Sequence, residues 1–145
     1  MQHLWSRARE LLRFDGRVSR LDYWRRVLLL TASLALILVV GIVAVMAAGP
    51  VGGLVFLAMA PVFLASIANS VRRLHDRGRG WLWAGLFLIG PWTMAAIAND
   101  MFGQGAWLPA FVASLVSLGV NLWGLVEIGF RRGKPGDNRY GPAPA

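Results

Sequence analysis

Residues 27–48 read VLLLTASLALILVVGIVAVMAA and contain no charged side chain. As an α-helix these 22 residues would be about 33 Å long, which matches the roughly 30 Å hydrocarbon core of a bilayer. The whole chain of 145 residues has the same character, since 57% of its residues are hydrophobic and 15% are charged. This composition predicts a membrane protein rather than a water-soluble domain.

Three further segments are apolar enough to cross a membrane: residues 51–71, 81–98 and 106–130. Only Gly49 and Pro50 separate the first two spans, so we expect a tight antiparallel hairpin, with Gly at the helix end and Pro unable to continue it. Residues 131–145 form a tail that is rich in turn formers. We therefore expect an all-α membrane protein, a bundle of four transmembrane helices that forms a single membrane domain over residues 1–145.

Basic residues predict the orientation of the bundle. Of the 15 Lys and Arg residues, seven precede the first span, four lie between the second and third spans, and four follow the fourth. The connections at 49–50 and 99–105 contain none. Because positively charged loops stay on the cytoplasmic side, both termini are expected in the cytoplasm.

Residues 1–19 are expected to form an interfacial amphipathic helix followed by a turn. The apolar residues Leu4, Trp5, Ala8, Leu11 and Leu12 recur at helical spacing, with arginines between them. A solvated basic segment that only sets the topology is the alternative. A cleaved signal peptide is disfavoured, because the apolar run exceeds the usual length of about 7 to 15 residues. Ser19 and Asp22 have the spacing of a capping box, which predicts a helix that begins near Arg20.

The end of the second span and the loop after it, residues 66–80, form the densest polar patch in the chain. Its simplest interpretation is topological, since short cytoplasmic loops are rich in arginine. The chain has two histidines and no cysteine, so no metal site is expected. His75 and Asp76 are adjacent on a helix and point about 100° apart, which disfavours a catalytic pair. No catalytic residue and no cofactor are predicted.

Glu127 is a carboxylate about one turn inside the end of the fourth span. Such a group normally has a partner, and Arg131 at i+4 could neutralise it, while Arg72 or Arg73 could reach it from the second helix. We interpret Glu127 and Arg131, together with Asp76 among the arginines, as a structural clamp rather than an ion pathway.

The three basic segments are expected to meet at the cytoplasmic face. Like charges crowded there repel unless an anion lies among them, and arginine's planar fork suits phosphate oxygens. We therefore expect a site for an anionic headgroup or phosphate. Its residues would be Arg17, Arg20, Arg72, Arg73 and Arg139. In the alternative, each arginine extends separately to bulk lipid and no defined site exists.

Three motifs occur in order along the chain: FDGRVSRLDYW at 14–24, RRLHDRGRGW at 72–81 and NRYGP at 138–142. Together they resemble the signatures of the domain of unknown function 805 family of small bacterial membrane proteins. The resemblance implies a bacterial inner-membrane protein and implies no particular activity. All three motifs lie on the side that the charge distribution makes cytoplasmic, which favours a single folded cap.

Three functions fit the sequence. The first is a non-enzymatic, multi-pass plasma membrane protein whose arginine-rich cap binds anionic phospholipid headgroups or a membrane protein partner. The second is an oligomeric transporter or channel component, in which a homo-oligomer would place Glu127 and Asn121 along a path. The third is a lipid-modifying enzyme that uses His75 and Asp76. Nucleic acid is not an expected partner, because arginines fixed at a membrane face meet anionic headgroups.

Overall fold

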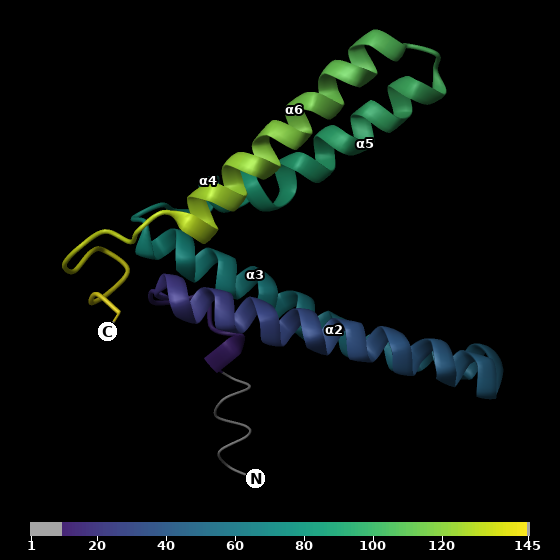
Figure 1. Ribbon diagram of the computed structural model, residues 1–145, viewed down its shortest axis with the longest axis horizontal. Helices are drawn as coiled ribbons and strands as arrows, with labels where there is room; N and C mark the ends of the chain where they lie inside the picture. The colour runs from purple at the N-terminus through teal and green to yellow at the C-terminus, as the bar shows by residue number, and fades with distance from the viewer. Residues whose placement is uncertain (1–9, 145) are drawn as a thin grey trace.

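A computed structural model describes residues 10–144, and two helical hairpins diverge from a common end (Figure 1). The first hairpin consists of α2 (Arg20–Ala48), a 3-10 helix (Gly49–Ala58) and α3 (Met59–Asp76). The second hairpin runs through α4 (Trp81–Ala84), a π-helical segment (Gly85–Ile89), α5 (Gly90–Gly103), α6 (Trp107–Leu125) and a second π-helical segment (Val126–Phe130). Across residues 10–144 the β-structure is one isolated bridge, between Asn138 and Gly141.

Glycines shape the tip of the first hairpin. The chain leaves α2 at Gly49, whose φ of 62° is strained for other residues, and Pro50 follows. A Cβ at Gly52 would overlap the backbone of Ala44, and one at Gly41 would overlap the ring of Phe56. The chain can therefore return close to α2 because Gly41 and Gly52 have no side chain.

Close packing also defines the second hairpin. A Cβ at Gly124 would lie 3.0 Å from Phe87 Cδ1, so glycine lets α6 approach the first half of the hairpin. Ser117 Oγ donates a hydrogen bond of 2.8 Å to the carbonyl of Pro91, which joins α6 to the start of α5. The small and polar residues of the fourth predicted span thus include one that ties two helices together.

Within residues 10–144, three continuous helical stretches are long and apolar enough to cross a membrane: Arg20–Asp76, Trp81–Gly103 and Trp107–Phe130. The first has 57 residues and contains both of the first two predicted spans. Four separate membrane-length helices are not seen among the described residues, because the first two predicted spans lie in one continuous stretch, and the hairpins diverge instead of forming a compact bundle (Figure 1). Hydropathy could not show this, since apolar side chains in lipid gain little from packing against one another.

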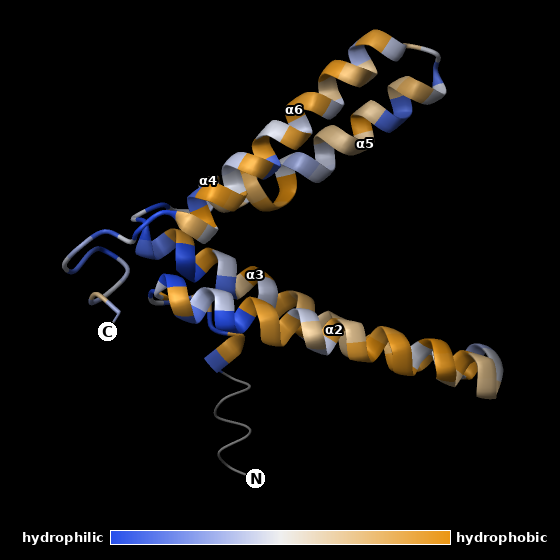
Figure 2. Cartoon of the chain, viewed as in Figure 1, coloured by the Kyte–Doolittle hydropathy of each residue, from blue (hydrophilic) through white to orange (hydrophobic). Residues whose placement is uncertain are grey.

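Hydrophilic residues gather where the two hairpins join. Apolar residues cover the rest of each hairpin, which we call an arm (Figure 2). A small core lies at this junction and is made of Val71, Leu74, Ala84, Phe87 and Ile128. Residues 131–144 contain no helix and pass over the junction. Most of the predicted interfacial helix falls on residues 1–9, outside the described residues.

Candidate functional site: an arginine-rich cap

Three segments distant in sequence meet at the junction, and we call them the cap: residues 10–20, 72–80 and 127–144. The first segment enters α2 through Ser19, whose Oγ accepts a hydrogen bond of 3.2 Å from the Asp22 backbone N–H. The same hydroxyl donates to Asp22 Oδ2 at 2.7 Å. This confirms the predicted helix start, and it fixes the direction in which residues 14–18 reach the other two segments.

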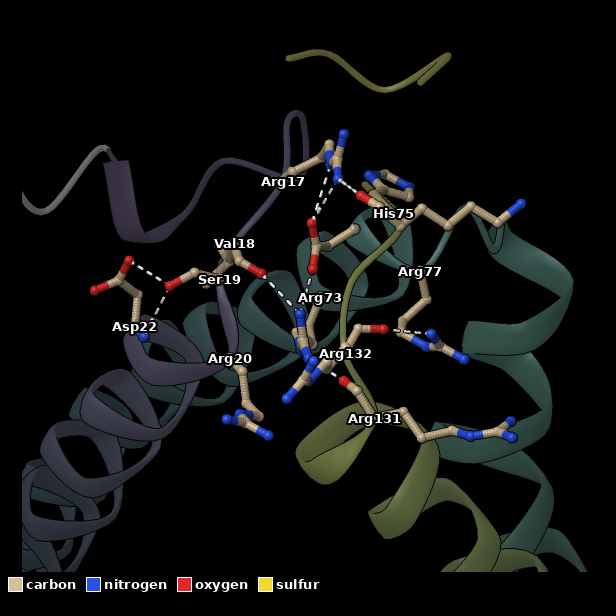
Figure 3. A network of polar contacts seen from close by, with 12 residues as sticks. Arg17, Val18, Ser19, Arg20, Asp22, Arg73, His75, Arg77, Arg131 and Arg132 are labelled. Carbon is tan, nitrogen blue, oxygen red and sulfur yellow. Dashed lines mark hydrogen bonds and ion pairs between the residues drawn. The ribbon is translucent and has the colours of Figure 1, made fainter. Parts of the chain in front are cut away.

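Asp76, the last residue of α3, is a buried acidic centre of the cap. It is 2% exposed, and its Oδ1 accepts a hydrogen bond of 3.0 Å from Arg17 Nε. Its Oδ2 accepts from Arg73 Nη1, as Figure 3 shows. One carboxylate thus pairs with two buried guanidinium groups, from two segments of the cap.

The remaining donors of these two arginines bind backbone carbonyls. Arg17 donates at 2.6 Å to the carbonyls of Lys134 and Gly136, both in the tail. Arg73 donates to the carbonyl of Ile128 at 3.0 Å and to that of Arg131. Ile128 and Arg131 lie where the last helix ends, and carbonyls there lack helical partners. The two arginines therefore fasten the tail and the end of the last helix to α3.

Glu127 is the second acidic centre, and it is fully buried, at 0% exposed. Its Oε2 accepts from Arg131 Nη1 at 2.9 Å. Its Oε1 accepts from Arg77 Nη2 at 2.9 Å and from Arg79 Nε at 2.7 Å. The predicted partners Arg72 and Arg73 are corrected to Arg77 and Arg79, because Arg73 is engaged by Asp76 and the carbonyls. Arg79 also lies 3.6 Å from the ring centre of Trp83, a cation–π contact.

His75 holds the tail rather than forming a pair with Asp76. Its ring stacks on Tyr140 with centroids 3.8 Å apart and planes within 5°. Its Nδ1 lies 3.3 Å from the Gly16 carbonyl, and its Nε2 is buried with no partner among residues 10–144. The described residues contain no group of three or more potential metal ligands. His75 therefore contacts the other two segments of the cap, through Tyr140 and Gly16.

A polar pocket of about 470 Å³ opens beside Asp76. Arg20, Arg132 and Lys134 line it together with Arg17 and Arg73. Arg20 makes one long hydrogen bond, 3.4 Å to the Phe130 carbonyl. Within residues 10–144 neither Arg20, Arg132 nor Lys134 forms a salt bridge.

A family model described as "Protein of unknown function (DUF805)" matches residues 11–142, a range that includes most of each cap segment. The chain belongs to the DUF805 family. Two Escherichia coli relatives, each named "Uncharacterized protein YiiR", come from strains K12 and O157:H7 and are 36% identical over 77 residues. The matched region covers 51% of this chain and 49% of each relative, so the chain spans about half the length of the curated relatives it matches. No solved structure gives a significant match.

The predicted headgroup residues of this DUF805 protein divide among three places. Arg17, Arg20 and Arg73 line the pocket beside Asp76. Arg72 lies elsewhere, where its Nη1 donates to the Glu10 carbonyl at 3.2 Å, and Arg139 lies over the Tyr140 ring at 4.8 Å. Sequence reasoning missed Arg132 and Lys134 as pocket residues. Their place directly after the last span was a usable signal, because it puts them at the same membrane face.

The cap and the first turns of α2 carry a large positive excess. Between residues 10 and 26, 72 and 79, and 127 and 139 there are 13 basic and six acidic residues, an excess of seven. Asp76 and Glu127 together hold five of these arginines. Of the eight other basic residues, Arg20 and Arg132 line the pocket beside Asp76 and have no salt bridge within residues 10–144.

Proposed function

We propose that this DUF805 protein is a multi-pass protein of the bacterial inner membrane whose cytoplasmic cap binds the phosphate of anionic phospholipids. In this proposal the chain crosses the membrane four times, and both termini are cytoplasmic. Two observations support four crossings. The 57-residue stretch Arg20–Asp76 reverses direction at Gly49, and the tips at 49–50 and 103–106 carry no Lys or Arg.

The pocket beside Asp76 carries the proposal of phosphate binding. Arg20 and Arg132 bring two further cations to its lining, whereas Lys134 lines it while its side chain runs along Gly78. The carboxylate in the pocket, Asp76, is already shared by Arg17 and Arg73. Guanidinium groups bind phosphate oxygens through paired hydrogen bonds, and anionic lipids attract basic groups at the cytoplasmic face. Arg17 and Arg73 form the base of the pocket and hold its walls in place.

The site recognises a phosphate monoanion or diester, which a lipid headgroup or a soluble phosphate could supply. Native mass spectrometry of the protein in mild detergent separates these sources. Phosphatidylglycerol, phosphatidylcholine and inorganic phosphate are added in separate arms. The proposal predicts one phosphatidylglycerol retained per protein, weak retention of phosphatidylcholine, and no displacement by inorganic phosphate at equal concentration.

Variants test which arginines matter. Replacing Arg20 and Arg132 together by Ala should weaken phosphatidylglycerol retention at least about tenfold, because each charge-assisted hydrogen bond contributes about 1.5–3 kcal/mol. Arg25→Ala is the matched control, since Arg25 is an exposed arginine on the same helix that pairs with Asp22 at 3.6 Å. Equal losses in both variants would overturn the pocket and favour arginines that act separately on bulk lipid. Equal competition by inorganic phosphate would overturn the lipid source.

A further inference from the structure

We propose that the apolar cleft between the two hairpins binds one hydrocarbon chain of a membrane lipid. The cleft has a volume of about 490 Å³ and lies between α3 and the first half of the second hairpin. Phe63, Ile67 and Val71 line one wall, and Ala84, Leu88 and Trp92 line the other. The site is separate from the polar pocket beside Asp76, with which it shares no lining residue.

The two serines that line the cleft, Ser66 and Ser70, have no free hydroxyl proton to donate to a ligand. Ser66 Oγ donates at 2.9 Å to the carbonyl of Val62, and Ser70 Oγ donates at 3.0 Å to the carbonyl of Ser66. Each hydroxyl therefore donates its hydrogen bond to a carbonyl within α3. A polar ligand placed here would lose hydrogen bonds to water and regain few of them from the mainly apolar lining, whereas a hydrocarbon chain loses nothing.

The position of the cleft also favours a lipid chain. Its walls belong to Arg20–Asp76 and Trp81–Gly103, two of the stretches that could cross a membrane. At the cap end Trp81, which lines the cleft, stacks on Phe14 with centroids 5.9 Å apart. Tryptophan is typical of the membrane–water interface. The cleft thus begins at the level of the headgroups and continues into the hydrocarbon layer.

The volume suits an extended chain better than a protein helix. An α-helix about 10 Å wide with a pitch of about 5.4 Å fills roughly 420 Å³ per turn, so the cleft would hold little more than one turn. If a methylene group takes about the volume of a water molecule, roughly 30 Å³, the same space holds a chain of about 16 carbons. A second copy of the chain is also disfavoured, because it would bring together two caps that each carry a positive excess of six.

A larger side chain at Gly85 would fill the cleft. Gly85 lines the cleft, and a Cβ added there meets no atom within 4 Å. Its φ of −55° and ψ of −48° are helical, so the backbone accepts other residues. Gly85→Leu should therefore fill the cleft without disturbing the fold. Gly119→Leu is the matched control, since Gly119 is also helical with no atom within 4 Å of an added Cβ, and it lies on α6 away from the cleft.

The experiment uses the full chain in nanodiscs of phosphatidylcholine that contain a phosphatidylcholine spin-labelled near the end of one acyl chain. Electron paramagnetic resonance measures how many lipids per protein are motionally restricted. The proposal predicts that Gly85→Leu removes about one restricted lipid per protein, that Gly85→Ala removes a smaller fraction, and that Gly119→Leu removes none. Thermal melting of each variant verifies that it is folded.

Equal restricted-lipid counts in folded wild type and Gly85→Leu would overturn the proposal. A dimer in the wild type that Gly85→Leu converts to a monomer would overturn it as well, because the occupant would then be a second copy. The proposal rests on the proposed membrane location but not on phosphate binding. Replacing Arg20 and Arg132 by Ala should leave the count with neutral phosphatidylcholine unchanged, so failure of either site is distinguishable from failure of the other.

Discussion

The cap and the two arms of the molecule are held together by different forces. In the cap, Asp76 and Glu127 bind five guanidinium groups, and those arginines also bind carbonyls of the tail. Along the arms, large apolar side chains such as Leu36 and Val39 are exposed, at 64% and 59%. The cap is therefore specified by directional hydrogen bonds, whereas much of the arm surface needs only to be apolar. Substitutions should be costly in the cap and tolerated on that surface.

The largest effect is expected from Asp76→Ala. This change leaves the guanidinium groups of Arg17 and Arg73 buried without their carboxylate, and such loss of one partner costs about 3–5 kcal/mol. The free energy of unfolding in detergent, measured with denaturant, should fall by that amount. Asp22→Ala is the matched control, because Asp22 is a more exposed acid paired with Arg25, and it should cost less than half as much. Equal losses in the two variants would contradict the claim that the buried Asp76 stabilises the fold more than an exposed acid does.

Glu127→Leu should have a smaller effect than Asp76→Ala. The side chains of its partners Arg77, Arg79 and Arg131 are 17%, 22% and 56% exposed, so they can turn to water or to headgroups once the acid is removed. We expect a loss of about 2 kcal/mol in the same unfolding measurement, from lost charge-assisted hydrogen bonds. Glu127→Gln should cost less, since the amide still accepts hydrogen bonds. A loss that exceeds that of Asp76→Ala would reverse the order of the two acidic centres.

Tyr140→Leu should loosen the tail without unfolding the hairpins. The stacked contact between Tyr140 and His75 is worth about 0.5–1.5 kcal/mol. Hydrogen exchange should become roughly threefold to tenfold faster at the amides of residues 137–141, which corresponds to that energy. Tyr140→Phe retains the ring and should exchange like the wild type. The prediction fails if both variants behave alike.

The smallest effect is expected on the arms. Leu36→Ala removes apolar surface that faces away from the protein, so the free energy of unfolding should change by less than about 0.5 kcal/mol. Leu74→Ala, in the fully buried core of the junction, should cost about 2–5 kcal/mol. A loss at Leu36 as large as that at Leu74 would show that the arms are packed against something in the native membrane.

The sequence was sufficient for features that depend on one segment. Hydropathy located the apolar stretches, and Ser19 marked the start of α2. The spacing of Glu127 and Arg131 placed that pair within one helical turn, and the structure has them 2.9 Å apart. Each of these features depends on the residue types within one short segment, so it could be predicted from the sequence.

Contacts between segments that are distant in the sequence were harder to predict from the sequence. From the sequence we expected the crowded arginines to need an anion among them, yet Arg17 and Arg73 also bind carbonyls of the tail and of the end of the last helix. Backbone carbonyls occur at every residue and leave no mark in the sequence. The choice of Arg77 and Arg79 over Arg72 and Arg73 for Glu127 depends on the rotation of α3. Hydropathy does not encode that rotation, nor the divergence of the hairpins.

Labelling of single cysteines tests most directly the claim that the cap lies on the cytoplasmic side of a protein that crosses the membrane four times. The chain has no cysteine, so Val51→Cys, Gln104→Cys and Asp137→Cys each introduce a unique thiol at the two tips and in the tail. In cells whose outer membrane has been permeabilised, an impermeant thiol reagent should label positions 51 and 104 but should label position 137 only after the inner membrane is opened. Labelling of position 137 in cells with an intact inner membrane, or protection of position 51 or 104, would contradict the account.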